Sequence, residues 1–176
     1  MPMLYEGRQH KRSSRESLDC AMALQELSAL GVDNLITFDA HDARVQNAIP
    51  NHGFENIQPA YQMIKALVKN IQDYLPGRPL TILTGVLADK DYNCMYRNVE
   101  PYAKEFITIT PGNPRALNAH DLAAYLSQFG KPVTACDQVA DGVRLAVEHA
   151  GKDGVVLCYG SLYMIGEIEA GLQALA

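Results

Sequence analysis

Two carboxylates and an imidazole stand close together in the segment Asp39-Ala40-His41-Asp42. This segment follows the β-branched and aromatic run NLITF, which is typical of a buried strand. Such ligands at a strand end suit a divalent cation that also bridges phosphate oxygens. Asp39 and His41 are therefore candidate metal ligands. The alternative is that Asp39 and Asp42 only cap the loop and the next helical turn.

A basic cluster lies near the amino end of the chain, where the rest of the sequence is acidic. Arg8, Gln9, Lys11 and Arg15 fall within eight residues, together with His10 and Arg12. Arginine can fork onto a phosphate and glutamine can contact a base edge, so the cluster is a candidate nucleotide-binding segment. The alternative is a solvated arm at a chain terminus.

Glycine and polar residues follow the later strand-like runs. They include the stretch GVLADKD from Gly85 to Asp91, the stretch PGNPR from Pro111 to Arg115, and Asp137. The pair Gly160-Ser161 opens the last predicted helix, where backbone N–H groups could hold an anion. The alternative for Ser161 is a plain helix N-cap.

The cysteines and the remaining histidines carry no recognisable chemistry. The four cysteines lie far apart without a CxxC spacing, which predicts reduced and mostly buried thiols. The histidines have no partner visible in the sequence, and we expect them to be exposed to solvent. The residues concerned are Cys20, Cys94, Cys136, Cys158, His52, His120 and His149. The sequence also lacks a GxxxxGK[ST] phosphate loop and a GxGxxG dinucleotide fingerprint after a strand.

The elements that must position these residues alternate between strand and helix. Periodicity and capping signals predict strands at 34–39, 80–86, 106–110, 132–136 and 154–159, and helices at 14–30, 58–75, 89–104, 118–129, 139–150 and 162–176. This alternation predicts an α/β fold with a single open, mainly parallel five-stranded sheet and helices on both faces. Ligands then gather beyond the carboxyl ends of the strands, where the polar segments lie.

Length and composition narrow the class of protein. The chain has 176 residues and a hydrophobic content of 48%, which favours a single domain over residues 1–176. Its formal net charge is −5, so the protein has no overall positive potential that would attract nucleic acid. The apolar runs are shorter than the roughly 20 residues of a membrane span. The first 15 residues lack the apolar stretch of a signal peptide. We expect a cytoplasmic protein that binds neither nucleic acid nor a membrane.

The first part of the chain resembles ribose-phosphate diphosphokinase. The resemblance covers about residues 4–71 and rests on the motifs YEGRQHKRSSRES, LGVDNLITFDAHDARVQNAIP and QPAYQMIKAL. It implies that Arg8 and Gln9 contact ATP and that Asp39 and His41 lie at a magnesium–triphosphate site. Lys11, Arg12 and Arg15 would then be neighbours of the nucleotide.

The second part, about residues 76–176, resembles the carboxyl-terminal domain of folylpolyglutamate synthase/dihydrofolate synthase, a relative of the Mur ligases. The motifs are PGRPLTILTGVLADKDY, ITITPGNPRAL and GSLYMIGEIEAG. The resemblance implies a domain that closes over ATP and helps to position the incoming glutamate. The motif residues that it carries over are Asp89, Lys90, Asp91, Asn113, Arg115, Ser161 and Tyr163.

Together the two resemblances predict a chimera joined near Lys69 to Tyr74, inside a predicted helix. The catalytic loops of the first family and the central ATPase domain of the second have no counterpart here. We therefore expect binding of ATP and magnesium without independent turnover, in a fragment most like the folate–glutamate ligase domain. The alternatives are a fragment of the diphosphokinase and a non-catalytic module that binds nucleotide or phosphate or associates with itself.

Overall fold

The computed structural model describes residues 19–38, 40, 43–50, 52–57 and 60–175. The chain divides into two compact units, Met1–Met63 and Ile64–Ala176. The amino-terminal basic cluster, Asp39, His41 and Asp42 lie outside the described residues.

The first unit is built on two parallel strands. It contains α1 (Asp19–Ala29), β1 (Asn34–Phe38), the 3-10 helix η1 (Ala43–Ala48) and β2 (Gly53–Ile57). β1 pairs with β2 with Asn34 opposite Gly53. Burial alternates along β1, and the small core consists of Cys20, Leu24, Leu35, Val45 and Ile49. The described parts of the predicted helix 14–30 and strand 34–39 are therefore confirmed, whereas β2 lies in a polar stretch where no strand was predicted.

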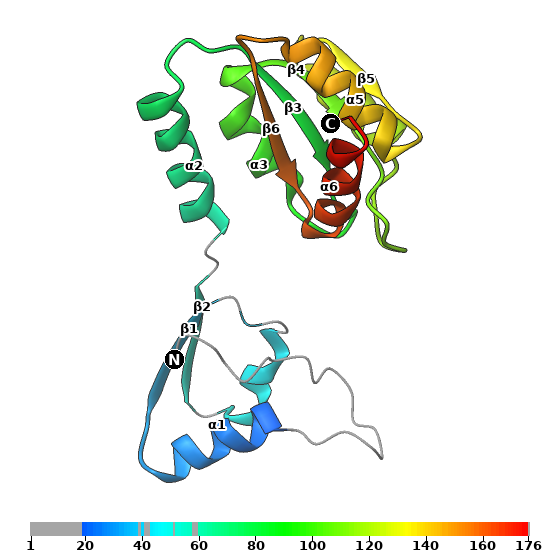
Figure 1. Cartoon of the computed structure of the whole chain (residues 1–176). Coiled ribbons are helices and arrows are strands. Elements are labelled where there is room, and N and C mark those ends of the chain that lie inside the picture. The colour runs from blue at the N-terminus through cyan, green and yellow to red at the C-terminus, as the bar shows by residue number, and fades with distance from the viewer. Residues whose placement is uncertain (1–18, 39, 41–42, 51, 58–59, 176) are drawn as a thin grey trace. The chain divides into compact units, whose positions relative to one another are not determined.

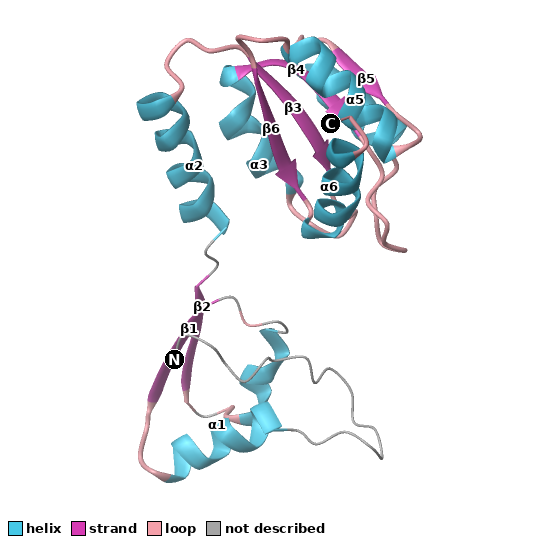
Figure 2. Cartoon of the chain, viewed as in Figure 1, coloured by secondary structure: helices cyan, strands magenta, loops and turns pink. Residues whose placement is uncertain are grey.

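The second unit holds a four-stranded parallel sheet in the order β5-β4-β3-β6. Figures 1 and 2 show these strands with helices on both sides. The helix α2 begins in the first unit, and its residues from Ile64 onward belong to the second. The elements of this part of the chain are α2 (Ala60–Tyr74), β3 (Leu80–Gly85), α3 (Tyr92–Val99), η2 (Glu100–Tyr102), β4 (Ala103–Thr108), α4 (Ala119–Leu126), η3 (Ser127–Phe129), β5 (Val133–Ala135), α5 (Val139–Ala150), β6 (Val155–Gly160), η4 (Leu162–Met164) and α6 (Ile165–Gln173).

Both faces of this sheet are covered by apolar side chains. Ile82 of β3 belongs to a cluster with residues of α2, α3, β4 and α4, and the next residue, Leu83, belongs to a second cluster with residues of α5 and α6. Successive side chains of a strand point to opposite faces, so a strand buried on both faces reads as a continuous apolar run. All six residues of β3 are buried, and β3 pairs with β4 on one side and with β6 on the other.

The α/β class with parallel strands and helices is confirmed, but the single five-stranded sheet is wrong. The described residues form six strands in two sheets, and β1 pairs with β2. Periodicity identifies a strand without naming its partner, because pairing is decided by contacts far apart in the sequence. That residues 1–176 unfold as one domain stays a prediction. Among the described helices, none is long and apolar enough to cross a membrane.

Several predicted exposures are also wrong. Only Cys20 is fully buried; Cys94 and Cys136 are partly buried, and Cys158 is exposed on β6. His52 is partly buried, and its Nε2 lies 2.9 Å from Ser28 Oγ. His149 is partly buried too, and its Nδ1 lies 2.7 Å from Glu105 Oε2. The partners are distant in sequence, so a linear pattern could not reveal them.

Candidate functional site at the carboxyl ends of the strands

The carboxyl ends of β3, β4 and β6 are locked together by backbone contacts. Ser161 N donates to Gly85 O at 2.8 Å, and Ile109 N donates to Thr84 O at 2.9 Å. Gly160 has a φ of 138°, and a Cβ atom there would collide with Gly85 O. Glycine is therefore needed at this crossing. The result is a fixed edge from which three polar segments emerge.

Two of these segments pair with each other beyond the sheet. Leu87 and Ala116 form an isolated antiparallel bridge. Ala88 N donates to Arg115 O, and Leu117 N donates to Val86 O, each at 2.9 Å. This pairing brings the β3–α3 loop alongside the β4–α4 loop, so residues 26 positions apart become neighbours.

An exposed ion pair bridges the two loops. Arg115 Nη1 lies 3.0 Å from Asp89 Oδ2, and both side chains are about half exposed. A surface pair of this kind contributes only about 0–1 kcal/mol, so its importance is that it orients the guanidinium. Lys90 follows Asp89 in the same loop, is exposed, and forms no ion pair with any other described residue. The structure thus places Arg115 beside Asp89, and the binding role of these motif residues stays a prediction.

Other predicted residues serve local structure. Asn113 Oδ1 accepts from Arg115 N at 2.9 Å, which shapes the loop that carries the arginine. Asp91 is the N-cap of α3 and accepts from Cys94 N at 3.3 Å. Ser161 Oγ accepts from Tyr163 N at 3.3 Å and caps η4. The N-cap alternative for Ser161 is therefore the observed one.

Two contacts at this edge were not predicted from the sequence patterns. His120 Nε2 lies 2.8 Å from Asp137 Oδ1, which joins the start of α4 to the segment after β5. The Glu167 carboxylate of α6 lies close to Gly112, where a Cβ atom would be 3.1 Å from Oε1. The place of Asp137 after a strand was predicted from the sequence, but neither its pairing with His120 nor the position of Glu167 had a sequence signal.

Buried hydroxyl groups form hydrogen bonds at the carboxyl end of β3. Thr84 Oγ1 lies 2.6 Å from Tyr96 OH and also bonds the Tyr159 carbonyl oxygen. Burial raises the pKa of Tyr96 far above its ordinary value, so this phenol stays protonated. Burial likewise raises the pKa of Tyr159 to about 12. These groups fix the end of β3 and titrate far above neutral pH.

The carboxyl end of β1 in the first unit carries fewer described candidate residues than the edge of the second unit. β1 ends at Phe38, and Ala40 N donates to Asn56 Oδ1 at 2.9 Å, which ties the residue between Asp39 and His41 to β2. The two predicted metal ligands lie outside the described residues, as do Arg8, Gln9, Lys11, Arg12 and Arg15. Within the described part of the chain, no group of three or more His, Cys, Asp or Glu side chains could hold a metal ion. The described residues therefore do not fit a metal site.

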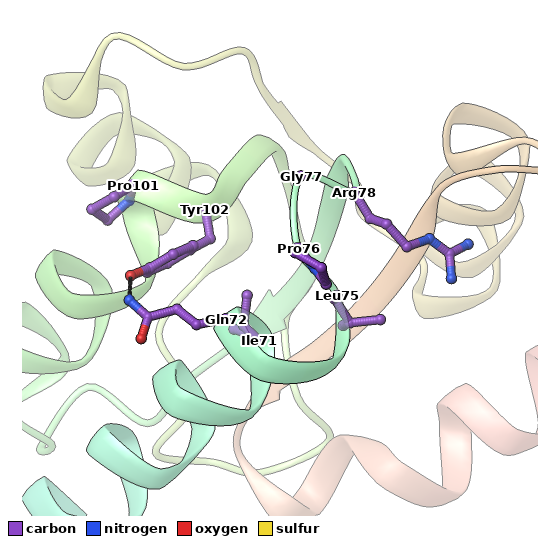
Figure 3. A pocket seen from close by; sticks show the side chains of 8 residues that line it. All are labelled: Ile71, Gln72, Leu75, Pro76, Gly77, Arg78, Pro101 and Tyr102. Atoms are coloured by element: carbon purple, nitrogen blue, oxygen red, sulfur yellow. Dashed lines mark hydrogen bonds between the residues drawn. The ribbon is translucent and has the colours of Figure 1, made fainter.

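A separate hollow lies at the opposite, amino-terminal edge of the sheet. It has a volume of about 420 Å³ and lies between the end of α2 and η2, with Ile71, Leu75, Pro76 and Pro101 among its lining. Figure 3 shows Gln72 and Tyr102 joined across it, with Nε2 2.5 Å from the phenol oxygen. The Arg78 guanidinium is turned toward the carbonyl oxygens of Asp153 and Gly154. These hydrogen bonds turn Nε and Nη2 of Arg78 to the backbone of the turn before β6.

Comparison with known proteins assigns the second unit. The family described as Mur ligase, glutamate ligase domain, matches residues 60–162, beginning at α2 and thus earlier than the expected Pro76. The dihydrofolate synthase/folylpolyglutamate synthase of Haemophilus influenzae is 32% identical over 114 residues, which are 64% of this chain and 25% of that protein. The chain therefore spans about a quarter of the length of this relative.

Solved structures show the same likeness. The bifunctional folylpolyglutamate synthase/dihydrofolate synthase of Yersinia pestis, complexed with AMPPNP and a Mn ion, has a TM-score of 0.52 and 23% identity and covers 65% of this chain and 26% of its own. The Mycobacterium tuberculosis folylpolyglutamate synthase complexed with ADP and AMPPCP has a TM-score of 0.50 and 25% identity, with 65% and 27% covered. The resemblance of residues 4–71 to ribose-phosphate diphosphokinase stays a prediction.

Proposed function

Since the chain belongs to the Mur ligase, glutamate ligase domain family, we propose that its second unit acts as the carboxyl-terminal domain of an ATP-dependent folate–glutamate ligase. In this role the unit binds the negative charge of the incoming glutamate or of the nucleotide phosphates. The binding surface is the edge that carries Asp89, Lys90 and Arg115. Support comes from the folylpolyglutamate synthases of similar fold, which were solved with nucleotides bound.

One observation carries the proposal: the Arg115–Asp89 ion pair across two adjacent strand-end loops. The pair engages Nη1 of Arg115, and the exposed Lys90 is the residue next to Asp89 in the chain. Arginine presents a rigid fork of donors that matches a carboxylate or a phosphate, and lysine adds a mobile point charge. Asp89 and Asp91 balance the formal charges of Lys90 and Arg115, so binding of an anion would rest on the donors of the guanidinium fork and of the ammonium group and not on a net charge of the surface.

In this proposal the residues bind and orient, and they do not complete a reaction. Lys90 and Arg115 neutralise the ligand, Asp89 orients Arg115, and Ser161 keeps the β6 end in place. Transfer chemistry needs a triphosphate and an acceptor held in line, and the sequence has no GxxxxGK[ST] loop for the triphosphate. The described residues also lack a metal site, so no step is assigned to a metal. We infer that the chain alone does not turn over ATP with folate and glutamate.

Binding measurements test the proposal directly. Titration of the chain with glutamate and, separately, with ATP, followed by NMR, should shift the amides of residues 88–91 and 113–116. Lys90→Ala and Arg115→Ala should each weaken binding at least about fivefold, the cost of one charge-assisted contact of roughly 1 kcal/mol. Arg144→Ala is the matched control, because Arg144 is equally exposed and also ion-paired.

Two results would contradict the proposal. Shifts that map elsewhere, or variants at Lys90 and Arg115 that bind as well as the control, would remove the assigned surface. ADP release that requires both folate and glutamate would show that the chain is catalytic by itself. Neither result depends on the oligomeric state of the chain.

A second candidate function belongs to the first unit. The Ala40–Asn56 hydrogen bond ties the strand ends where Asp39 and His41 follow β1, and such strand ends are where parallel sheets place ligands. We propose that Asp39 and His41 bind magnesium-ATP, with Arg8, Gln9, Lys11 and Arg15 on the nucleotide. Calorimetric titration with Mg-ATP should give weak binding that Asp39→Asn, His41→Ala and Arg8→Ala reduce without lowering the melting temperature. Unchanged binding in these variants would refute it.

A further inference from the structure

The buried hydroxyl group of Thr84 links α3, β3 and β6 at the carboxyl end of the sheet. Thr84 is the last residue but one of β3, and Thr84 and Tyr96 of α3 are both completely buried. Thr84 Oγ1 lies 2.6 Å from Tyr96 OH and also bonds the Tyr159 carbonyl oxygen of β6. All three residues belong to the second unit, so these contacts lie within one unit.

The direction of both hydrogen bonds follows from the groups that form them. A carbonyl oxygen can only accept, so Thr84 donates its single hydroxyl hydrogen to Tyr159. Thr84 Oγ1 is then the acceptor toward Tyr96, whose phenol donates. A threonine or serine hydroxyl at position 84 can make both bonds, whereas an apolar side chain of the same shape can make neither.

The bond between Thr84 and Tyr96 closes the base of the loop that carries Asp89 and Lys90. The two residues stand on either side of this loop, 12 positions apart in the sequence. α3 also packs on the sheet through apolar side chains such as Val99, but apolar contacts are non-directional. Among the described residues, the Tyr96 phenol makes the only hydrogen bond between α3 and a strand. It therefore fixes α3, and with it the end of the loop, relative to β3.

This loop is held in turn to the loop that carries Arg115. Ala88 N donates to Arg115 O, and Leu117 N donates to Val86 O, each at 2.9 Å. The ion pair between Asp89 and Arg115 adds an exposed contact of the side chains. A shift of α3 is therefore transmitted to both loops, because backbone hydrogen bonds join them beyond the sheet.

We propose that Thr84 and Tyr96 are positioning residues for the binding surface of Asp89, Lys90 and Arg115. Their hydrogen bond keeps the loop of Lys90 in place beside the loop of Arg115, and neither side chain reaches the surface, since both are completely buried. Position matters because charge-assisted hydrogen bonds weaken steeply when their distance or angle is wrong. The inference rests on the proposed function, because it needs an anion bound at that surface.

Isosteric substitutions separate the hydrogen bond from the packing. Thr84→Val and Tyr96→Phe keep the shape of the side chains and remove the bond, whereas Thr84→Ser keeps the bond. In separate NMR titrations with glutamate and with ATP, Thr84→Val and Tyr96→Phe should each weaken binding at least about threefold, and Thr84→Ser should bind as the parent chain does. The double variant should bind no more weakly than Thr84→Val, because the two substitutions break the same bond.

Thr81→Val is the matched control. Thr81 is a completely buried threonine of the same strand, and its Oγ1 donates to Glu105 Oε1 at 2.9 Å near the opposite end of β3. The control should lower the melting temperature and leave binding unchanged. Amide hydrogen exchange without ligand gives a second readout, since Ala88 and Leu117 should exchange faster in Thr84→Val and in Tyr96→Phe than in the control.

The outcomes distinguish this inference from the proposed function. If Arg115→Ala weakens binding but Thr84→Val and Tyr96→Phe do not, the proposed function stands and the positioning role is wrong. Equal losses of binding in Thr84→Val and Thr81→Val would also overturn the role, since binding would then follow stability. If Thr84→Val does not fold, Tyr96→Phe decides alone, because it leaves no buried donor without an acceptor. If Arg115→Ala binds as well as the parent chain, the proposed function is wrong and the positioning role falls with it.

Discussion

Glu105 is a buried carboxyl group on β4 that ties the sheet to the end of α5. Thr81 Oγ1 donates to Glu105 Oε1 at 2.9 Å, and His149 Nδ1 lies 2.7 Å from Oε2. Burial by itself raises the pKa of Glu105, but the hydrogen bonds of His149 and Thr81 and the charge of Lys104 hold it below its ordinary value of 4.5. The folded state therefore favours the carboxylate more than the unfolded state does.

The sign of the pH dependence follows from this depressed pKa. The stabilisation by Glu105 is complete above pH 4.5 and is lost as the pH falls through the folded-state pKa. Glu105→Gln should lower the free energy of unfolding at neutral pH by about 1–3 kcal/mol, because His149 and Thr81 lose their charged partner. Below pH 4.5 this difference should shrink.

Urea unfolding over a pH series measures both effects. The matched control is Glu148→Gln, which changes an exposed glutamate of α5, the helix that carries His149, and should cost less than about 0.5 kcal/mol at any pH. A Glu105→Gln difference that stays constant down to the acid transition would show that the carboxylate has no depressed pKa.

At the scale of elements, two helical glycines make opposite predictions for the same substitution. A Cβ atom on Gly142 of α5 would lie 2.5 Å from Ile109 Cγ2, whereas nothing lies within 4 Å of one on Gly166 of α6. Alanine in a helix gains up to about 1 kcal/mol over glycine, but overpacking a core contact costs about 1–3 kcal/mol. Gly142→Ala should therefore lower the melting temperature and Gly166→Ala should raise it. Differential scanning calorimetry of both variants measures the two melting temperatures. A Gly142→Ala variant that melts at a higher temperature than the parent chain would mean that α5 is not packed tightly against Ile109.

At the scale of the whole molecule, α2 decides whether the chain unfolds as one domain. Its residue Ile71 is buried in the cluster on one face of the second unit's sheet, and Leu67 packs against that cluster. The described residues of the first unit form a two-stranded sheet and a core of five buried residues, which is too little for independent stability. We predict that a cut after Asn70 abolishes cooperative melting of both fragments, 1–70 and 71–176.

A fragment of residues 60–176, which keeps α2 whole and contains the family match, serves as the control and should melt cooperatively. Circular dichroism of the three fragments against temperature makes the comparison. Cooperative melting of both 1–70 and 71–176 would show that the two segments are separate domains and that α2 does not hold the second unit together.

The strands and helices of the second unit could be predicted from local patterns in the sequence, and so could the polar segments that follow its strands. The burial of a run such as LTILTG can be predicted from its sequence, because a strand that is covered on both faces is apolar along most of its length. The glycines and charges after these runs, Asp89 and Arg115 among them, mark strand ends. The location of these residues at the carboxyl edge therefore follows from two things: the local strand pattern that precedes them, and the rule that parallel strands end at the same edge of a sheet.

The side chains that come into contact could not be predicted from local patterns. The Asp89–Arg115 pair depends on the bridge between Leu87 and Ala116, and the Glu105–His149 pair joins residues 44 positions apart. Strand partners were likewise beyond the sequence, so the strand at 34–38 pairs with an unpredicted polar strand and the sheet of the second unit ends at β6. The physical reason is that pairing energy comes from contacts between distant segments, which periodicity within one segment does not encode.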